Sequence, residues 1–469
     1  MDPTAPEKLK LKCEVGLLGG ISLIAGVMIG SGIFMSPQTV LMNIGSPGAS
    51  LVIWASCGLL AVLASLSYAE MGTVIRESGG EYIYILRTSG PVMAFTLAYT
   101  SVLVVRPTGI AGVALSFSQY TLAPIYGDCP PPVVIVKCLA AVSILLLGIV
   151  NCLNVRYSMH IMVFFTVVKM LALVVIVIGG VVLLIKGNRA GLEDSFDGTN
   201  ESASAIGLAF FQCLWSYDGW NNLNYVTEEL KRPEVNLPRA LMIAIPLVTI
   251  LYLLVNVSYL TVLTPQEMIT SNAVAVAWGN KVLGGWGWLM SVAAALSAFG
   301  SLNGTFFSGG RVCFVAAREG HMPDILAMAH VRRLTPSPAL IFTTAISLIV
   351  LIPGDFQSIV NFFSFTAWFF YGVTISGLLY LKIKKPDLPR PYKVPIFIPV
   401  LVLLMAVFLV LAPIIDDPQI EYLYVTLFIL SGILFYIPFI HFKLFPGILN
   451  KLTVYLQLFL EVAPAEKNL

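Results

Sequence analysis

The stretch Met28-Ile29-Gly30-Ser31-Gly32-Ile33-Phe34 interrupts an apolar run that begins near Val15 and continues for more than 20 residues. A run of this length is what an α-helix needs to cross about 30 Å of hydrocarbon. Two glycines around a serine weaken a helix by about 1 kcal/mol each relative to alanine. Backbone groups freed by a break in a membrane need new partners, so breaks occur where they line a polar cavity. The stretch predicts a broken membrane helix, although close packing through small residues would explain the same glycines.

A second apolar run carries a stronger interruption, Trp215-Ser216-Tyr217-Asp218-Gly219-Trp220-Asn221-Asn222. A charge at the membrane centre costs about 3 kcal/mol on insertion scales, so such a residue normally faces a cavity or a partner. Interrupted segments in corresponding places of two halves of a chain indicate the substrate site of a transporter. The two breaks fall in the first and sixth apolar segments. They correspond if segments one to five and six to ten form an inverted repeat.

The rest of the chain has the composition of a membrane protein. Of its 469 residues, 58% are hydrophobic and 11% are charged, whereas a soluble domain carries about 25% charged residues. The net charge of +2 argues against binding to nucleic acid. No cleavage site of small residues follows the first apolar run, so we expect a retained helix and not a signal peptide.

We therefore expect an all-α integral membrane protein with twelve transmembrane helices and no soluble insertion. The expected spans are residues 15–41, 47–73, 90–120, 131–151, 158–185, 203–227, 238–263, 282–312, 338–353, 357–381, 395–414 and 420–442.

The spans divide the chain into five parts. Residues 1–14 form an N-terminal segment, 15–185 the first repeat, 203–381 the second repeat, 395–442 two further spans, and 443–469 a tail. An amphipathic helix on the inner membrane face and a partly disordered tail both fit the last part.

The basic residues predict the orientation. An even number of spans places both ends on one side, and most of the 27 Lys and Arg residues fall on that side. Acidic residues such as Glu193, Asp194 and Asp197 lie on the other side. Because basic loops stay in the cytoplasm, we predict cytoplasmic termini.

The two breaks also predict how a ligand is held. The half-helix that begins near Ser31 and Gly32 would offer free N–H groups to an α-carboxylate. Unwound carbonyls near Met28, Trp215 and Ser216 would accept an α-ammonium. The expected ligand is an amino acid. The expected substrate-binding residues are Met28, Ile29, Gly30, Ser31, Gly32, Trp215, Ser216, Asp218, Asn221 and Asn303.

Two polar residues of the eighth span have alternative interpretations. Asn303 and Ser297 either line the cavity opposite Asp218 or pack between helices.

These motifs resemble those of the light subunits of heteromeric amino-acid transporters, which belong to the amino acid–polyamine–organocation superfamily. The similarity covers nearly the whole chain. Besides the two breaks it rests on Ser36-Pro37, Glu70, Ser78-Gly79-Gly80-Glu81-Tyr82, Thr227-Glu228-Glu229, Asn236-Leu237-Pro238-Arg239, Gly310-Arg311 and Arg318-Glu319-Gly320-His321-Met322-Pro323. The run from Leu214 to Asn221 is similar to the b0,+-type light subunit, with Ser216 in place of an alanine.

The resemblance implies a LeuT-like fold with a 5+5 inverted repeat and no cofactor. It implies a sodium-independent antiporter that exchanges extracellular cationic amino acids and cystine for intracellular neutral amino acids by alternating access. Trp215 would be the aromatic gate over the substrate. The implied location is the plasma membrane, apical in epithelia for the b0,+-type.

Asp218 is the residue that favours cationic substrates. At 4 Å and an effective dielectric constant of 20, a carboxylate attracts a guanidinium or ammonium by about 4 kcal/mol before desolvation. The alternative is that Asp218 caps a half-helix and never contacts the ligand. Two other functions stay open, a uniporter of cationic amino acids or polyamines and an exchanger of large neutral amino acids.

Two further basic residues lie inside apolar spans. Lys169 needs an acceptor, since a buried lysine otherwise loses its proton. By resemblance it replaces the cation of sodium-coupled relatives and contacts carbonyls of the broken first helix; the alternative is an internal water pocket. The pair Arg106-Pro107 predicts a buried charge and a kink in the third span. By analogy with relatives, Arg106 is expected near an outer vestibule.

Two outward-facing sites complete the expectations. Cys129 lies in a loop on the oxidising side of the membrane. By resemblance it forms a disulfide with a single-span glycoprotein heavy subunit; the alternative is a free exposed thiol. The motif Asn200-Glu201-Ser202 in another outer loop predicts a glycosylation site. The seven cysteines show no metal-ligand spacing.

Overall fold

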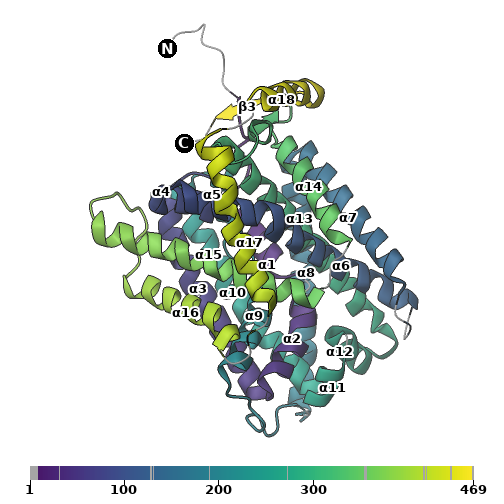
Figure 1. Ribbon diagram of the computed structural model, residues 1–469. Coiled ribbons are helices and arrows are strands. Elements are labelled where there is room, and N and C mark those ends of the chain that lie inside the picture. Colours follow the sequence, from purple (N-terminus) through teal and green to yellow (C-terminus); the bar gives the residue numbers. More distant parts are fainter. Residues whose placement is uncertain are drawn as a thin grey trace.

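The computed structural model describes residues 9–30, 32–126, 129, 131–189, 191–271, 273–352, 356–415, 418, 420–443 and 446–466. Ser31, one of the expected binding residues, therefore lies outside the described residues. Within these ranges the chain is almost entirely helical (Figure 1).

The first half of the chain contains β1 (Leu9–Lys10), α1 (Leu17–Met28), α2 (Gly32–Ile44), α3 (Pro47–Val74), α4 (Glu81–Ser89), α5 (Pro91–Thr100), the π-helix η1 (Ser101–Val105), α6 (Arg106–Tyr126), α7 (Val133–Leu153) and α8 (Val155–Ile185). The second half contains α9 (Ala203–Tyr217), η2 (Asn222–Glu229), α10 (Pro233–Val262), α11 (Pro265–Thr270), α12 (Val274–Val282), η3 (Gly284–Trp286), α13 (Trp288–Arg318), η4 (Asp324–Ala327), β2 (Met328–His330), α14 (Ser337–Leu351) and α15 (Phe356–Lys384). The chain ends with α16 (Phe397–Ile415), α17 (Ile420–Tyr436), the π-helix η5 (Ile437–His441), α18 (Pro446–Leu460) and β3 (Val462–Glu466).

The described helices confirm a membrane protein with many spans. Nine of them are long and apolar enough to cross a membrane, and the bent pair α1 and α2 makes a tenth. The remaining two expected spans, 203–227 and 338–353, correspond to α9 with η2 and to α14, whose α-helical parts are 15 residues each. The exact number of twelve stays a prediction.

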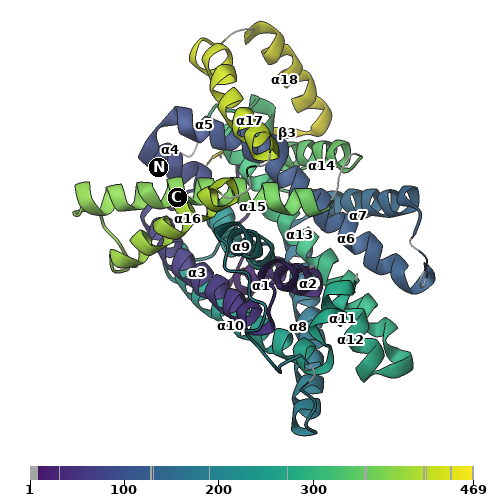
Figure 2. The same ribbon diagram turned by 60° about the horizontal axis from the view of Figure 1, so that its bottom comes forward.

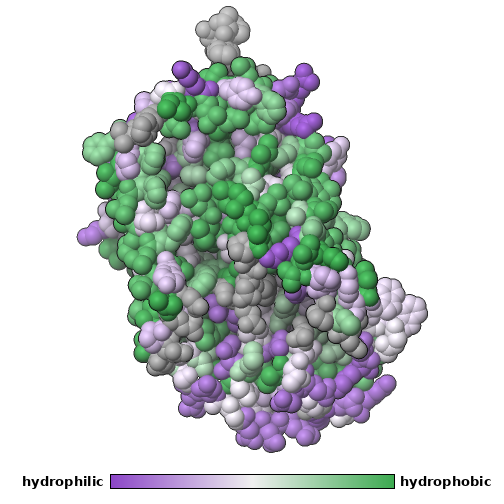
Figure 3. Space-filling model, turned by 45° about the vertical axis from the view of Figure 1, so that its right-hand side comes forward, coloured by the Kyte–Doolittle hydropathy of each residue, from purple (hydrophilic) through white to green (hydrophobic). Residues whose placement is uncertain are grey.

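The outer surface of the helices is apolar, as a lipid environment requires. Leu, Ile, Val and Phe side chains are exposed along α7, α8, α16 and α17. Figure 3 shows hydrophobic residues over most of the middle of one face and hydrophilic residues gathered toward its lower end. In hydrocarbon such a surface is stable because each helix satisfies its own backbone groups.

Helices from corresponding places in the two halves pack against each other. α2 packs against α9, α3 against α10, α6 against α13, and α7 against α14. Figure 2 shows α1, α2 and α9 at the centre, with the other helices around them. This pairing agrees with the expectation of two related halves, which stays a prediction.

A small sheet joins three distant segments at the end of the molecule where both termini lie (Figure 1). β3 pairs in parallel with β1 and antiparallel with β2. The helix α18 precedes this sheet and exposes apolar side chains, among them Ile448, Tyr455 and Phe459. The expected tail helix is thus present, while its contact with a membrane stays a prediction.

Candidate substrate site

The first break lies where the glycines predict it. α1 ends at Met28 and α2 begins at Gly32, and the two helices are bent by 41° relative to each other. A Cβ atom on Gly30 would lie 2.7 Å from the Ser301 hydroxyl, and one on Gly32 would lie 2.7 Å from the Ser216 Cα atom. A larger residue at Gly30 or Gly32 would push α13 or α9 away. The two glycines therefore allow these helices to approach the first break closely, in addition to breaking the helix.

The second break lies between α9 and η2. Asp218 follows the last helical residue with an extended backbone (φ −60°, ψ 143°), and Gly219 has a φ of +100°. A positive φ of this size is accessible to glycine without strain. The chain then continues as the 3₁₀-helix η2. Both interruptions predicted from the sequence are confirmed.

Side chains of α10 and α13 bind the carbonyl groups that the first break leaves free. The Tyr252 hydroxyl donates to the Met28 carbonyl and, at 2.7 Å, to the Ser216 carbonyl. The Ser297 hydroxyl donates to the carbonyls of Ile29 and Gly30 at 2.9 Å and 3.2 Å. Tyr252 thus links the two breaks through a single hydroxyl group. Spacing in the sequence gave no sign of its role.

A cavity with about 430 Å³ of empty space lies between the breaks. Three of the expected binding residues, Gly32, Trp215 and Asp218, line its wall. The Trp215 indole packs edge-on against Phe363, with 5.2 Å between the ring centroids. The other lining residues are Val27, Arg106, Gly109, Val113, Ser301, Thr305 and Phe363. Asp218 therefore caps α9 and faces the cavity at once, so its two interpretations do not exclude each other.

Asn303 and Asn221 do not line this cavity. Asn303 accepts a hydrogen bond from Asn151 at 3.0 Å and donates to the Ser158 carbonyl at 3.2 Å, which fixes it between α13, α7 and α8. Asn221 donates to the Glu81 carboxylate. The structure thus supports the packing interpretation of Asn303 and moves Asn221 to a different network.

Arg106 is buried and lines the cavity between the two breaks. It follows the π-helix η1, so the irregular turn expected beside Pro107 is present. Its guanidinium donates to the Tyr225 hydroxyl and lies 4.6 Å from the centroid of that ring. The Tyr225 hydroxyl in turn donates to Glu81. Its expected position near an outer vestibule stays a prediction.

A second cavity, also with about 430 Å³ of empty space, lies on the other side of Arg106. Arg106 and Phe363 line both cavities, and Glu81, Tyr225 and Tyr371 line the second one only. A buried ion pair lies close to this cavity in the chain, with 2.5 Å between Nε of Arg311 and Oε1 of Glu229. Arg311 precedes the lining residue Val312 in α13, and Glu229 belongs to η2, as does the lining residue Tyr225.

Lys169 contacts the broken first helix as expected. Its side chain is buried, and its ammonium donates to the Gly26 carbonyl at 2.5 Å. A Cβ atom on Gly300 would lie 3.1 Å from this nitrogen. The ammonium therefore sits between α1, α8 and α13, beside the first break.

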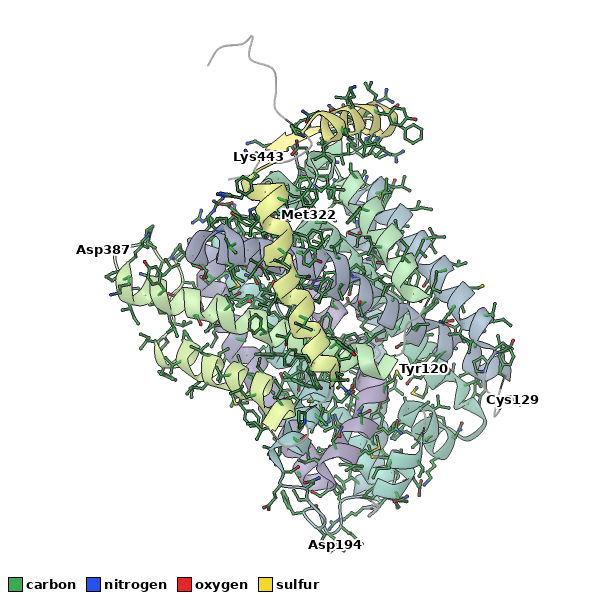
Figure 4. The ribbon with its side chains drawn as sticks, viewed as in Figure 1. Tyr120, Cys129, Asp194, Met322, Asp387 and Lys443 are labelled. Carbon is green, nitrogen blue, oxygen red and sulfur yellow. The ribbon has the colours of Figure 1, made fainter. Side chains whose placement is uncertain are left out.

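The two residues that are expected on the outer side are accessible. Cys129 is exposed, and Figure 4 shows it at the edge of the molecule, beyond the end of α6. Asn200 is also exposed, and its side-chain oxygen accepts a hydrogen bond from the backbone N–H of Ser202 at 3.1 Å. Figure 4 shows Asp194 and Lys443 at opposite ends of the structure.

The chain is similar to known membrane proteins over almost its whole length. Residues 15–437 match the model of the amino acid permease family. The human b(0,+)-type amino acid transporter 1 is 50% identical, with 99% of this chain and 96% of that protein covered. The human cystine/glutamate transporter is 42% identical, with 100% and 94% covered. The human large neutral amino acids transporter small subunit 2 is 45% identical, with 87% and 77% covered.

Proposed function

The chain belongs to the amino acid permease family, and we propose that it is a sodium-independent antiporter that exchanges extracellular cationic amino acids and cystine for intracellular neutral amino acids. The observation that carries the substrate class is the half-buried carboxylate of Asp218 on the wall of the central cavity, beside the two breaks. The family transports its ligands and does not transform them, so no catalytic residue is needed.

The geometry supports a specific arrangement of the substrate. The backbone N–H groups at the start of α2, near Gly32, bind the α-carboxylate, because a helix N-terminus carries a positive dipole end. The unwound carbonyls of α1 and α9 accept the α-ammonium together with the Tyr252 hydroxyl, which already contacts two of them. The side chain extends toward Asp218, where a guanidinium or ammonium group finds its counter-charge.

Lys169 accounts for the independence from sodium. An ammonium group already occupies the space beside the carbonyls of α1, where its positive charge stabilises the negative ends of the peptide dipoles. Binding of an external cation at the same place would add like charge in a buried site, which costs several kcal/mol. The fixed charge of Lys169 thus replaces a coupling ion.

The proposal extends to the assembly and its orientation. Cys129 forms a disulfide with a single-span glycoprotein heavy subunit; its exposed thiol and the placement of its loop by the Lys and Arg pattern support this pairing. Both termini face the cytoplasm in the plasma membrane, because Lys and Arg gather at that end. Asn200 is the glycan site of the outer side.

Counter-flow in proteoliposomes tests the function. The purified protein is reconstituted, loaded with unlabelled leucine and supplied with labelled arginine outside, with sodium or with N-methylglucamine. We expect rapid arginine entry that needs internal leucine and is equal in both buffers. Entry of the same rate into empty vesicles would identify a uniporter, and entry that requires sodium would contradict the role of Lys169.

A further inference from the structure

Ser216 places a buried hydroxyl group beside the start of α2. The residue is 1% exposed, and its Oγ atom has no hydrogen-bond partner among the described residues. Burial of a polar group without a partner is unfavourable, so an orphaned hydroxyl in a packed interior needs an explanation. Ser216 lies in the chain between Trp215 and Asp218, which both line the central cavity. The ligand of this cavity is therefore a candidate partner for the hydroxyl.

Other hydroxyl groups in the central helices bond to their own helix. Ser116, Thr305 and Ser308 each donate to the carbonyl four residues earlier, at 3.1 Å, 2.9 Å and 3.1 Å. This local bond is common for a serine or threonine inside an α-helix. Ser216 lies in the last turn of α9, and its hydroxyl does not make this bond in the part of the chain that the structure describes. The hydroxyl is thus available to a group outside α9.

The hydroxyl lies next to the first residue of α2. A Cβ atom on Gly32 would lie 2.6 Å from Oγ of Ser216, and Gly32 lines the central cavity. The first N–H groups of an α-helix have no partner within the helix, and the peptide dipoles make this end positive. The Ser216 hydroxyl therefore adjoins the place where an α-carboxylate binds to the start of α2.

The carbonyl group of Ser216 has a separate partner. It accepts a hydrogen bond from the Tyr252 hydroxyl at 2.7 Å, and the same hydroxyl also donates to the Met28 carbonyl. A serine hydroxyl can donate a proton to an anion, whereas a carbonyl oxygen can only accept one. The two polar groups of Ser216 therefore suit opposite ends of an amino acid, the carbonyl its ammonium and the hydroxyl its carboxylate.

We propose that the Ser216 hydroxyl donates a hydrogen bond to the α-carboxylate of the substrate and thereby selects ligands that carry this group. The assignment rests on the proposed function, since it adds a donor to the carboxylate end of the same central site. A hydrogen bond to an ionised acceptor is about twice as strong as one between neutral groups. Amines without a carboxylate, polyamines among them, gain nothing from this donor. Ser216 thus favours amino acids over such amines.

Equilibrium binding of labelled L-leucine to the purified protein in detergent tests this assignment. Ser216→Ala should raise the Kd for leucine about tenfold and leave the Kd for 3-methylbutylamine, which is leucine without its carboxylate, unchanged in competition. The melting temperature without ligand should not fall, because the variant removes a hydroxyl that has no partner among the described residues. Ser364→Ala is the matched control. The buried Ser364 hydroxyl donates to the Phe211 carbonyl of α9 at 3.2 Å, so its loss should lower the melting temperature and leave leucine binding unchanged.

An unchanged Kd for leucine in Ser216→Ala would overturn the assignment, whatever the amine does. An equal rise in Kd for leucine and for the amine would overturn it too, because the hydroxyl would then act on something other than the carboxylate. Counter-flow separates this result from the proposed function. If the unmodified protein exchanges arginine for leucine and Ser216→Ala binds leucine as tightly as before, the function stands and the assignment fails. If leucine binding needs the hydroxyl but no exchange occurs, the assignment stands and the proposed function fails.

Discussion

The ammonium nitrogen of Lys169 lies 2.5 Å from the carbonyl oxygen of Gly26, in the last turn of α1. α1 ends two residues later at Met28, so this bond stabilises the helix end beside the substrate cavity. A positive charge is favourable at a helix C-terminus because the peptide dipoles end there with their negative pole. Lys169 therefore joins α8 to the end of α1 beside the first break.

Lys169→Ala should reduce arginine–leucine counter-flow at least tenfold at equal protein amount. The change leaves a buried carbonyl without its partner, at a cost of about 1–3 kcal/mol, and removes the fixed charge. Lys186→Ala is the control, because Lys186 follows the same helix and is exposed. If Lys169→Ala exchanged as fast as the unmodified protein, the ammonium would have no role in the first break.

Asp218→Asn should remove most arginine and lysine transport and preserve leucine transport. A loss of even 1.4 kcal/mol of attraction between the carboxylate and a cationic side chain is a tenfold loss in affinity. The variant keeps the shape of the residue, so the break itself persists. Asp324→Asn, at an exposed position in η4, serves as the control. Competition of each substrate with labelled leucine measures the effect, and equal inhibition by arginine in variant and unmodified protein would refute it.

The sequence predicted the two breaks well because the cause of each is local. Gly30, Gly32 and Gly219 mark the interruptions, and Asp218 marks the polar side of the second one. The membrane spans were also predictable, since hydrophobic length follows directly from bilayer thickness. Boundaries inside the broken segments were less certain, because α9 ends at Tyr217 and η2 continues in a tighter helix.

The partners of the polar residues were not predictable in the same way. Tyr252 is far from Met28 in the sequence, and Tyr225 is far from Glu81, and each pair meets only after the helices pack. Asn303 and Asn221 resembled cavity residues because both are polar in apolar segments, yet each pairs with another side chain. Polarity inside a membrane predicts a partner, and only the packing decides whether that partner is a ligand.

Tyr252→Phe should weaken the binding of every substrate by a similar factor. The hydroxyl links the carbonyls of Met28 and Ser216, which belong to the two breaks. A single hydrogen bond contributes about 1 kcal/mol, so we expect a three- to tenfold rise in KM for arginine and leucine alike. Tyr259→Phe is the control, because its hydroxyl lies 3.5 Å from the Ile33 carbonyl and makes a weaker bond. An effect on arginine alone would place Tyr252 at the side-chain end of the site instead.

Glu229→Gln should destabilise the whole protein and not only its transport. Glu229 and Arg311 are both 0% exposed, and two bonds of 2.5 Å and 3.0 Å join them. Removal of one partner from a buried ion pair costs about 3–5 kcal/mol, because the other charge stays buried. A fall in the melting temperature in detergent, measured by fluorescence, is expected. The exposed pair of Lys281 and Glu267 provides the comparison, and Glu267→Gln should change the melting temperature little.

Cys129→Ser should abolish a disulfide-linked complex in native membranes. Cys129 is exposed at the start of the segment that leads into α7, and an oxidising compartment favours disulfide formation at such a site. On a non-reducing gel the unmodified protein should migrate as a larger species that reducing agent converts to the single chain. Cys138→Ser is the matched control, because Cys138 is also exposed but lies within the membrane-length helix α7. The larger species should persist in the Cys138→Ser variant. If the unmodified protein migrates as a single chain without reducing agent, Cys129 is a free thiol.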